Sequence, residues 1–142
     1  MPFIITWPRV VNSGEISNVP ISSLDIYPTL SEIAKINLPH SKPFEGISLL
    51  PLLTQKEPEL SRDHFFWAGG RMGKNRGAIL KDGWKLIINH KGEDLLFNLD
   101  KDPNETLNLI ANYPNKSQTL KSIFTNILEG MPEPITDRAK LK

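Results

Sequence analysis

The sequence predicts an α/β protein whose C-terminal subdomain is α+β: a four-stranded antiparallel sheet with a packed C-terminal helix. We expect a strand and a helix from the edge of a larger α/β domain to precede it. Asp82-Gly83 separates two apolar runs, and this dipeptide favours a two-residue hairpin because a type I′ turn needs positive φ twice. Apolar residues recur at helical spacing over 120–128, which indicates an amphipathic helix.

An apolar run at 3–7 predicts the larger domain. Its β-type composition is typical of a strand that is buried on both faces, and nothing in the chain precedes it. The predicted hairpin agrees, since neither of its faces is polar: Ile79, Trp84, Leu86 and Ile88 share one face, and Ala78, Leu80, Lys85 and Ile87 share the other. The C-terminal helix can cover one face. We expect the other cover to lie partly outside this chain.

Composition excludes several function classes. The 142 residues can form an ordinary domain, and a net charge of +1 gives no field that would attract nucleic acid or an acidic membrane. The absence of cysteine excludes disulfides, thiolate metal sites and a cysteine nucleophile. No apolar run reaches the roughly 20 residues of a membrane span, and the first ten residues do not resemble a signal peptide.

The N-terminal part should hold one helix. Asp25 precedes the segment 26–36, in which Ile26, Leu30, Ile33 and Ala34 fall on one helical face. The proline-rich stretch that follows, 37–59, predicts an extended connection with at most a short helical turn at 49–53.

The C-terminal part supplies the rest of the predicted sheet. Residues 63–68 are the expected fourth strand, and 95–99 form the last strand of the meander. Asp102, Pro103 and Glu105 predict a second helix through a capping box. Asp100, Asp102 and Glu105 also resemble the start of a calcium loop, but Glu105 occupies the position where that loop needs glycine. We therefore favour capping over metal binding.

Five segments in order resemble the C-terminal part of the sulfatase family, the arylsulfatase-type sulfuric ester hydrolases of the alkaline-phosphatase superfamily. They are PFIITWPRVVNSGEIS, SSLDIYPTL, FEGISLLPLL, GWKLI and LLFNLDKDPNETLNL. The chain departs from the family pattern at Arg9, where glycine is usual, and at Phe97-Asn98, where Tyr-Asp is usual. The resemblance implies that 1–60 is the edge of an alkaline-phosphatase-like catalytic domain, 61–130 the C-terminal subdomain and 131–142 a flexible tail.

The resemblance also implies what this chain lacks. Family members hydrolyse sulfate esters with a formylglycine made within a C/S-x-P-S-R motif, beside a calcium ion, and both lie upstream of the PFIITWP segment. Here Ser41-Lys42-Pro43 is not followed by Ser-Arg, so we assign no catalytic and no metal residue. The expected partners are the preceding catalytic domain and, through it, a sulfated glycan or an aryl sulfate. The longer protein is expected to be exported, periplasmic or extracellular, or lysosomal.

Four residues are candidates for contact with an anionic substrate. Arg71, Lys74 and Arg76 lie among glycines, and backbone amides beside an arginine suit an oxyanion. His64 begins a predicted strand and could face the domain boundary. The alternative is a solvated loop with a packed histidine. For Trp67 and Trp84 we favour a core role over a sugar platform, because both lie within strand patterns.

Two other functions stay open. The chain could be a stand-alone module that binds a glycan or a protein, or part of a related phosphodiesterase or phosphonate hydrolase. In each case the apolar surface of 3–7 with Ile26, Leu30 and Ile33 lacks a partner in this chain. We expect the isolated chain to dimerise or aggregate through it.

Overall fold

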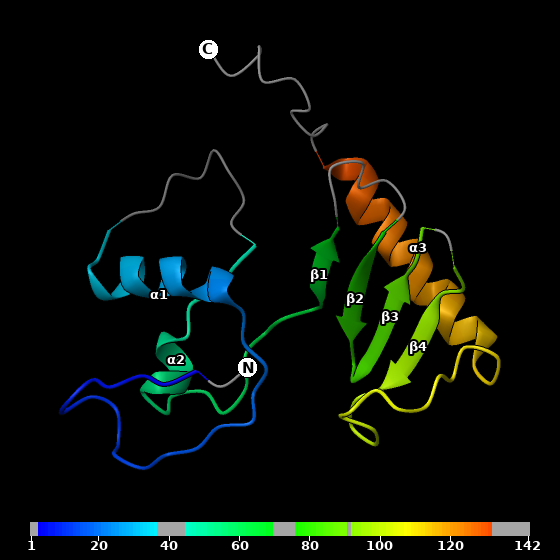
Figure 1. Cartoon of the computed structure of the whole chain (residues 1–142). Helices are drawn as coiled ribbons and strands as arrows, with labels where there is room; N and C mark the ends of the chain where they lie inside the picture. The colour runs from blue at the N-terminus through cyan, green and yellow to red at the C-terminus, as the bar shows by residue number, and fades with distance from the viewer. Residues whose placement is uncertain (1–2, 37–44, 70–75, 91, 132–142) are drawn as a thin grey trace. The chain divides into compact units, whose positions relative to one another are not determined.

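The computed structural model describes residues 3–36, 45–69, 76–90 and 92–131. The chain divides between residues 62 and 63 into two units, and the described residues of each unit are treated by themselves (Figure 1). Among the described residues, no helix has both the length and the apolar character needed to cross a membrane.

The first unit contains short helices and long irregular segments. A 3-10 turn, η1 (Ser23–Asp25), leads into α1 (Ile26–Ile33), and α2 is the single turn Leu50–Leu53. Both helices were predicted. The strand predicted at 3–7 is not formed in this chain: these residues belong to no helix or strand of the described part. A strand needs a neighbour for its backbone N–H and C=O groups.

Helix α1 buries its polar side. Pro28, Thr29 and Ser31 are buried, whereas Ile26 and Leu30, on the predicted apolar face, are exposed, Leu30 by 59%. The apolar face of α1 is therefore without cover in the described part of the chain.

Polar contacts attach α1 to the segment before α2. The carboxylate of Asp25, which is fully buried, accepts the N–H groups of Ser22 at 2.7 Å and Ile47 at 3.0 Å and pairs with Arg62. One turn further on, the hydroxyl of Thr29 accepts the N–H of Leu49 at 2.8 Å. We call these contacts the Asp25–Thr29 clamp.

A glycine lets the two clamped segments approach each other. A Cβ atom at Gly46 would lie 2.0 Å from the carbonyl oxygen of Leu24, which no side chain tolerates. The clamp thus gives a physical reason for two sequence patterns, D-x-x-P-T at 25–29 and E-G-x-S-L at 45–49, because their residues are in contact here.

The second unit is a four-stranded antiparallel meander in the order β1-β2-β3-β4. Its strands are β1 (Phe65–Ala68), β2 (Gly77–Lys81), β3 (Trp84–Ile88) and β4 (Leu95–Asn98). Lys81 pairs with Trp84, and Asp82 and Gly83 have φ values of 51° and 73°. The predicted hairpin and its register are confirmed.

Helix α3 (Pro114–Gly130) lies across one face of the sheet (Figure 1). Its Leu120 and Phe124 join the buried core of Ile79, Leu86, Ile88 and Leu96. The predicted helix and the sheet face that it covers are confirmed, and the second unit is α+β as expected.

The helix predicted after Asp102 is wrong. Residues 99–113 form successive turns, in which Asp102 accepts the N–H groups of Thr106 at 2.7 Å and Leu107 at 2.8 Å. Glu105 has a φ of 56°, which ends any helical path, and its carboxylate pairs with Lys85 at 2.5 Å instead of capping.

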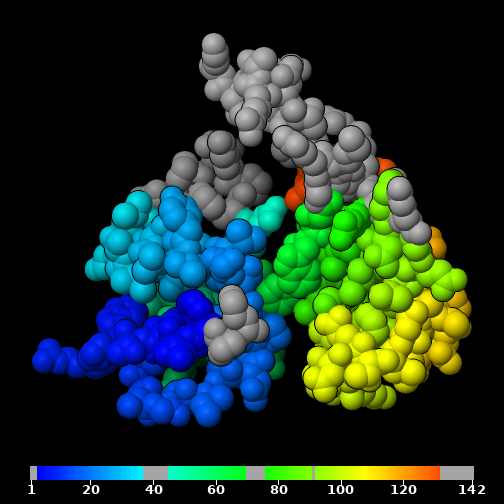
Figure 2. Space-filling view, in the orientation of Figure 1, coloured from blue at the N-terminus to red at the C-terminus, as the bar shows by residue number. Residues whose placement is uncertain are grey.

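The 99–113 segment covers the outer edge of the sheet. Leu109 donates its N–H to the carbonyl of Leu96 at 2.8 Å, and the side-chain oxygen of Asn108 accepts the N–H of Leu96 at 3.0 Å. Figure 2 shows this segment, in yellow, packed against its own unit. Pairing with the β4 edge thus replaces the helix that the capping residues predicted.

Candidate functional site

Two of the four predicted contact residues lie within the described part of the chain. His64 directly precedes β1, and Arg76 directly precedes β2. Because the strands are antiparallel and Gly69 faces Arg76, the two residues stand at opposite ends of the hairpin. Along the strands, His64 and Arg76 are five residues apart, which corresponds to about 16 Å at 3.3 Å per residue. Arg71 and Lys74 lie outside the described residues.

The His64 end of the hairpin carries an ion-pair cluster. Asp63 pairs with Lys81 and lies 2.9 Å from Nδ1 of His64. The hydrogen bond from Lys81, and then that from His64, lowers the pKa of the exposed Asp63 carboxyl, and Asp63 raises the pKa of Lys81. Each charge is thus stabilised by its neighbour, and the described contacts of Asp63 and Lys81 already explain both shifts.

The Arg76 end forms a shallow hollow of about 240 Å³, lined by Trp67, Gly69, Arg76, Ala78, Ile87 and Asn89 among others. These six residues lie on the sheet face opposite α3, because Trp67 pairs with Ala78 and Ala78 with Ile87. The expectation that Trp67 belongs to the core is wrong, since 48% of it is exposed. Trp84 is half-buried against the core, as expected.

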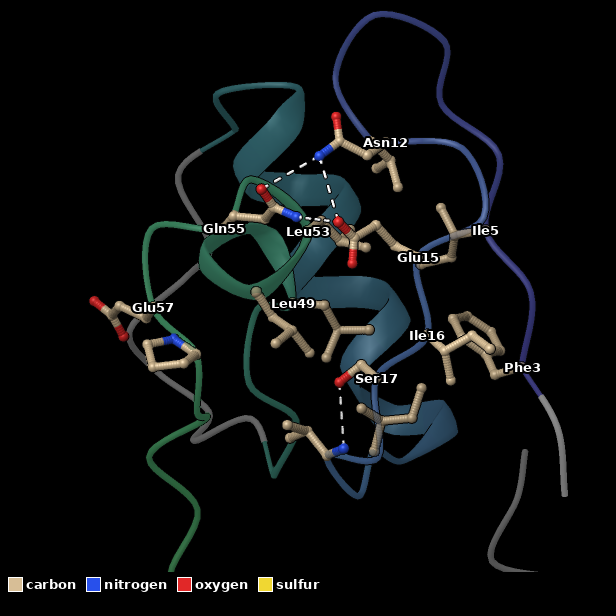
Figure 3. A pocket seen from close by; sticks show the side chains of 15 residues that line it. Phe3, Ile5, Asn12, Glu15, Ile16, Ser17, Leu49, Leu53, Gln55 and Glu57 are labelled. Carbon is tan, nitrogen blue, oxygen red and sulfur yellow. Dashed lines mark hydrogen bonds between the residues drawn. The ribbon is translucent and has the colours of Figure 1, made fainter.

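The first unit contains a larger apolar groove of about 420 Å³ (Figure 3). Phe3, Ile5, Ile16, Leu49 and Leu53 are among its lining residues. At its rim, Gln55 donates to Glu15 at 2.7 Å and accepts from Asn12 at 3.3 Å. The groove thus offers apolar surface with a polar rim in which Asn12, Glu15 and Gln55 are already paired with one another, and Ser17 and Glu57 also line it.

No metal or formylglycine site is built from the described residues. They contain no group of three or more His, Cys, Asp or Glu side chains that could hold a metal ion. The buried Asp25 is saturated by two backbone N–H groups and Arg62, and Asp102 by its own turn. These residues therefore do not fit the calcium site that the sulfatase resemblance implies for the longer protein.

Comparison with known proteins identifies the family. The family model described as N-sulphoglucosamine sulphohydrolase, C-terminal, matches residues 1–131. The chain belongs to this sulfatase family.

Relatives of this sulfatase region are longer proteins. The chain is 31% identical to an arylsulfatase of Clostridium perfringens over 99% of its length, and 29% identical to arylsulfatase K of Danio rerio over 91%. It spans only 30% and 26% of those two proteins. It also shares its fold, with a TM-score of 0.69 and 23% identity, with BT4656 solved in complex with its substrate D-glucosamine-2-N,6-O-disulfate. That likeness covers 89% of this chain and 27% of BT4656.

Sequence reasoning missed two features of this sulfatase region. The Asp25–Thr29 clamp depends on contacts across 20 and 22 residues, which no local pattern reveals. The exposure of Trp67 could have been found from alternation: Phe66 packs on Phe124 of α3, at 4.8 Å between ring centroids, so its neighbour on β1 faces the other way.

Proposed function

We propose that this chain is the C-terminal part of a sulfatase that hydrolyses sulfate esters, and that it packs on the preceding catalytic domain and shapes the substrate cleft. The family match over 1–131, combined with coverage of only 26% and 30% of the two relatives, carries the proposal. On this proposal the formylglycine and the calcium ion belong to the rest of the protein, and the chain is inactive alone.

The exposed apolar surface of the first unit supports packing on another domain. Ile4 and Ile16 are each 87% exposed, and Phe3, Ile26 and Leu30 are also exposed. Exposed apolar residues gathered in one small unit mark an interaction surface. The groove in Figure 3 adds a concave part that side chains of the catalytic domain could fill.

For the second unit we propose contact with the substrate. Arg76 is exposed, and with Arg71 and Lys74 it would place cations beside a sulfated substrate, since arginine binds oxyanions through two parallel N–H groups. The substrate of BT4656 is a sulfated glucosamine, which makes a sulfated sugar a reasonable substrate class here. His64, about 16 Å away, would be a separate contact.

The test is a sulfatase assay on this chain and on the longer protein, with a chromogenic aryl sulfate and calcium. Activity in the longer protein alone is the expected result. Activity of the 142-residue chain alone would refute the proposal, because it would require a catalytic site within it. Hydrolysis of a phosphonate monoester without hydrolysis of sulfate esters would favour the phosphonate hydrolase alternative.

Measurements of oligomeric state, glycan binding and the length of the protein in the cell separate the binding-module alternative. A chain that stays monomeric and binds a glycan tightly, with no longer protein made in the cell, would favour the stand-alone module.

We also propose that the longer protein is exported or lysosomal. Cell fractionation tests this, and recovery of the active enzyme from the cytosol would contradict it.

A further inference from the structure

We infer that the hollow at Trp67 and Arg76 is a subsite for one sulfated sugar ring, in which the ring lies on Trp67 and its sulfate pairs with Arg76. The inference rests on the proposed sulfatase function for the class of ligand. The geometry of the subsite comes from the second unit alone.

Trp67 presents a fixed aromatic surface. Its ring is stacked on that of Phe65, with 5.9 Å between centroids and 8° between planes, within the range of a favourable offset stack. This contact holds the indole in place while 48% of the residue stays exposed. A preorganised exposed ring suits the C–H face of a sugar, because little side-chain entropy is lost on binding.

The neighbouring strands leave space beside that ring. The residue paired with Trp67 is Ala78, and the next across is Ile87, so a small side chain lies between two large ones. The hollow of about 240 Å³ is smaller than the roughly 300–1,000 Å³ of pockets for drug-sized ligands. Its size therefore favours a single ring over an extended chain.

Arg76, which directly precedes β2, lies on the same face as Ala78, two residues before it. A Cβ atom at Gly69 would lie 3.5 Å from Cγ of Arg76 and 3.8 Å from its Cδ. The side chain of Arg76 therefore lies over the bare backbone of Gly69, two residues from Trp67. Arg76 is an exposed residue, so its charge can pair with an oxyanion without the desolvation cost of a buried ion pair.

The charges of the lining favour an anion. Among the described residues that line the hollow, Arg76 is the charged one and none is a carboxylate, while Asn89 adds an amide. The amide of Asn89 is oriented, since its Nδ2 donates to the carbonyl of Glu93 at 2.8 Å. An acidic protein segment would also match the cation, but a sulfated ring uses the flat indole and the small volume as well.

The first experiment follows indole N–H resonances of the 142-residue chain by NMR during titration with glucosamine carrying N- and 6-O-sulfates. We expect the Trp67 signal to shift saturably, while that of Trp84, on the opposite face, does not. Arg76→Gln should weaken binding of the sulfated sugar about tenfold and remove its preference over unsulfated glucosamine. Lys101→Gln, at an exposed cation in the 99–113 segment, is the matched control and should change neither.

Three outcomes would overturn the subsite: a Trp67 signal that does not move, equal shifts with unsulfated glucosamine, or equal losses in Arg76→Gln and Lys101→Gln. A second measurement uses the longer protein. There Trp67→Ala should raise KM for a sulfated oligosaccharide more than KM for a small aryl sulfate. A Trp67 that the catalytic domain shields from an aqueous quencher would also overturn it.

Failure of the subsite and failure of the sulfatase proposal are distinguishable. Binding at Trp67 in a protein that hydrolyses no sulfate ester would refute the proposed function and leave the subsite. An active sulfatase without binding at Trp67 would do the reverse.

Discussion

Neutralising the buried carboxylate of the Asp25–Thr29 clamp should release the segment that precedes α2. In Asp25→Asn one amide oxygen can still accept an N–H, but the amide NH₂ would face a second donor, and the ion pair with Arg62 would be lost. The Asp25 side chain is fully buried and that of Arg62 is 10% exposed. Removing one partner of a buried ion pair costs about 3–5 kcal/mol, a large part of the 5–15 kcal/mol that holds a domain folded.

Amide hydrogen exchange measures this loss at the clamped residues. A cost of about 3 kcal/mol corresponds to exchange more than 100-fold faster at Ile47 and Leu49, whose N–H groups the clamp binds. Glu15→Gln is the matched control: the same carboxyl-to-amide change at an exposed position of the same unit, with an expected cost below about 1 kcal/mol. Protection factors within threefold of wild type in Asp25→Asn would refute the reasoning.

Three further predictions concern the core, the acid range and self-association. Phe124→Ala removes a ring that is 2% exposed and should destabilise the second unit by about 3–5 kcal/mol in urea denaturation; a loss below 1 kcal/mol would contradict this packing. Hydrogen bonds to Asp102, first of all the one from the N–H of Leu107, lower the pKa of its carboxyl below the usual 3.8. The carboxylate therefore stabilises its turn fully above pH 3.8, and this stabilisation is lost as the pH falls through the lowered pKa. The Leu107 amide signal should therefore titrate below pH 3.8 and should not titrate there in Asp102→Asn, whereas a midpoint at or above 3.8 would exclude this cause. Sedimentation of the isolated chain should show concentration-dependent association that Ile4→Lys with Leu30→Lys reduces; a monomer at high concentration would count against the exposed apolar surface.

Much of the second unit could be predicted because its signals are local. Asp82-Gly83 specifies its turn through two positive φ values, and a two-residue turn sets which residues pair. The periodicity of Leu120 and Phe124 predicts the buried side of α3. In both cases the residues that carry the pattern are the ones that make the contact.

Prediction failed where a distant partner decides the outcome. Asp102 caps backbone N–H groups as expected, yet no helix follows, because Asn108 and Leu109 pair with the edge of β4. The apolar face of α1 was identified correctly, but the helix buries Thr29 because a hydroxyl is needed to bind Leu49. Of the residues that line the hollow, Arg76 was a candidate from its residue type, whereas Trp67 was assigned to the core because its β-strand context was taken to mean burial.

Residues 37–44 lie between the two clamped segments in the sequence. Because the clamp fixes both segments, we expect the stability of the first unit to depend little on the number of residues at 37–44. Both anchors, Asp25 and Thr29 on one side and 46–49 on the other, are fixed by hydrogen bonds that do not involve the residues between them. Doubling the length of a loop adds only about 0.6 kcal/mol of closure entropy. Insertions at 37–44 should accordingly be tolerated, and this position suits an epitope or a fluorescent label that reports on the first unit without disturbing its fold.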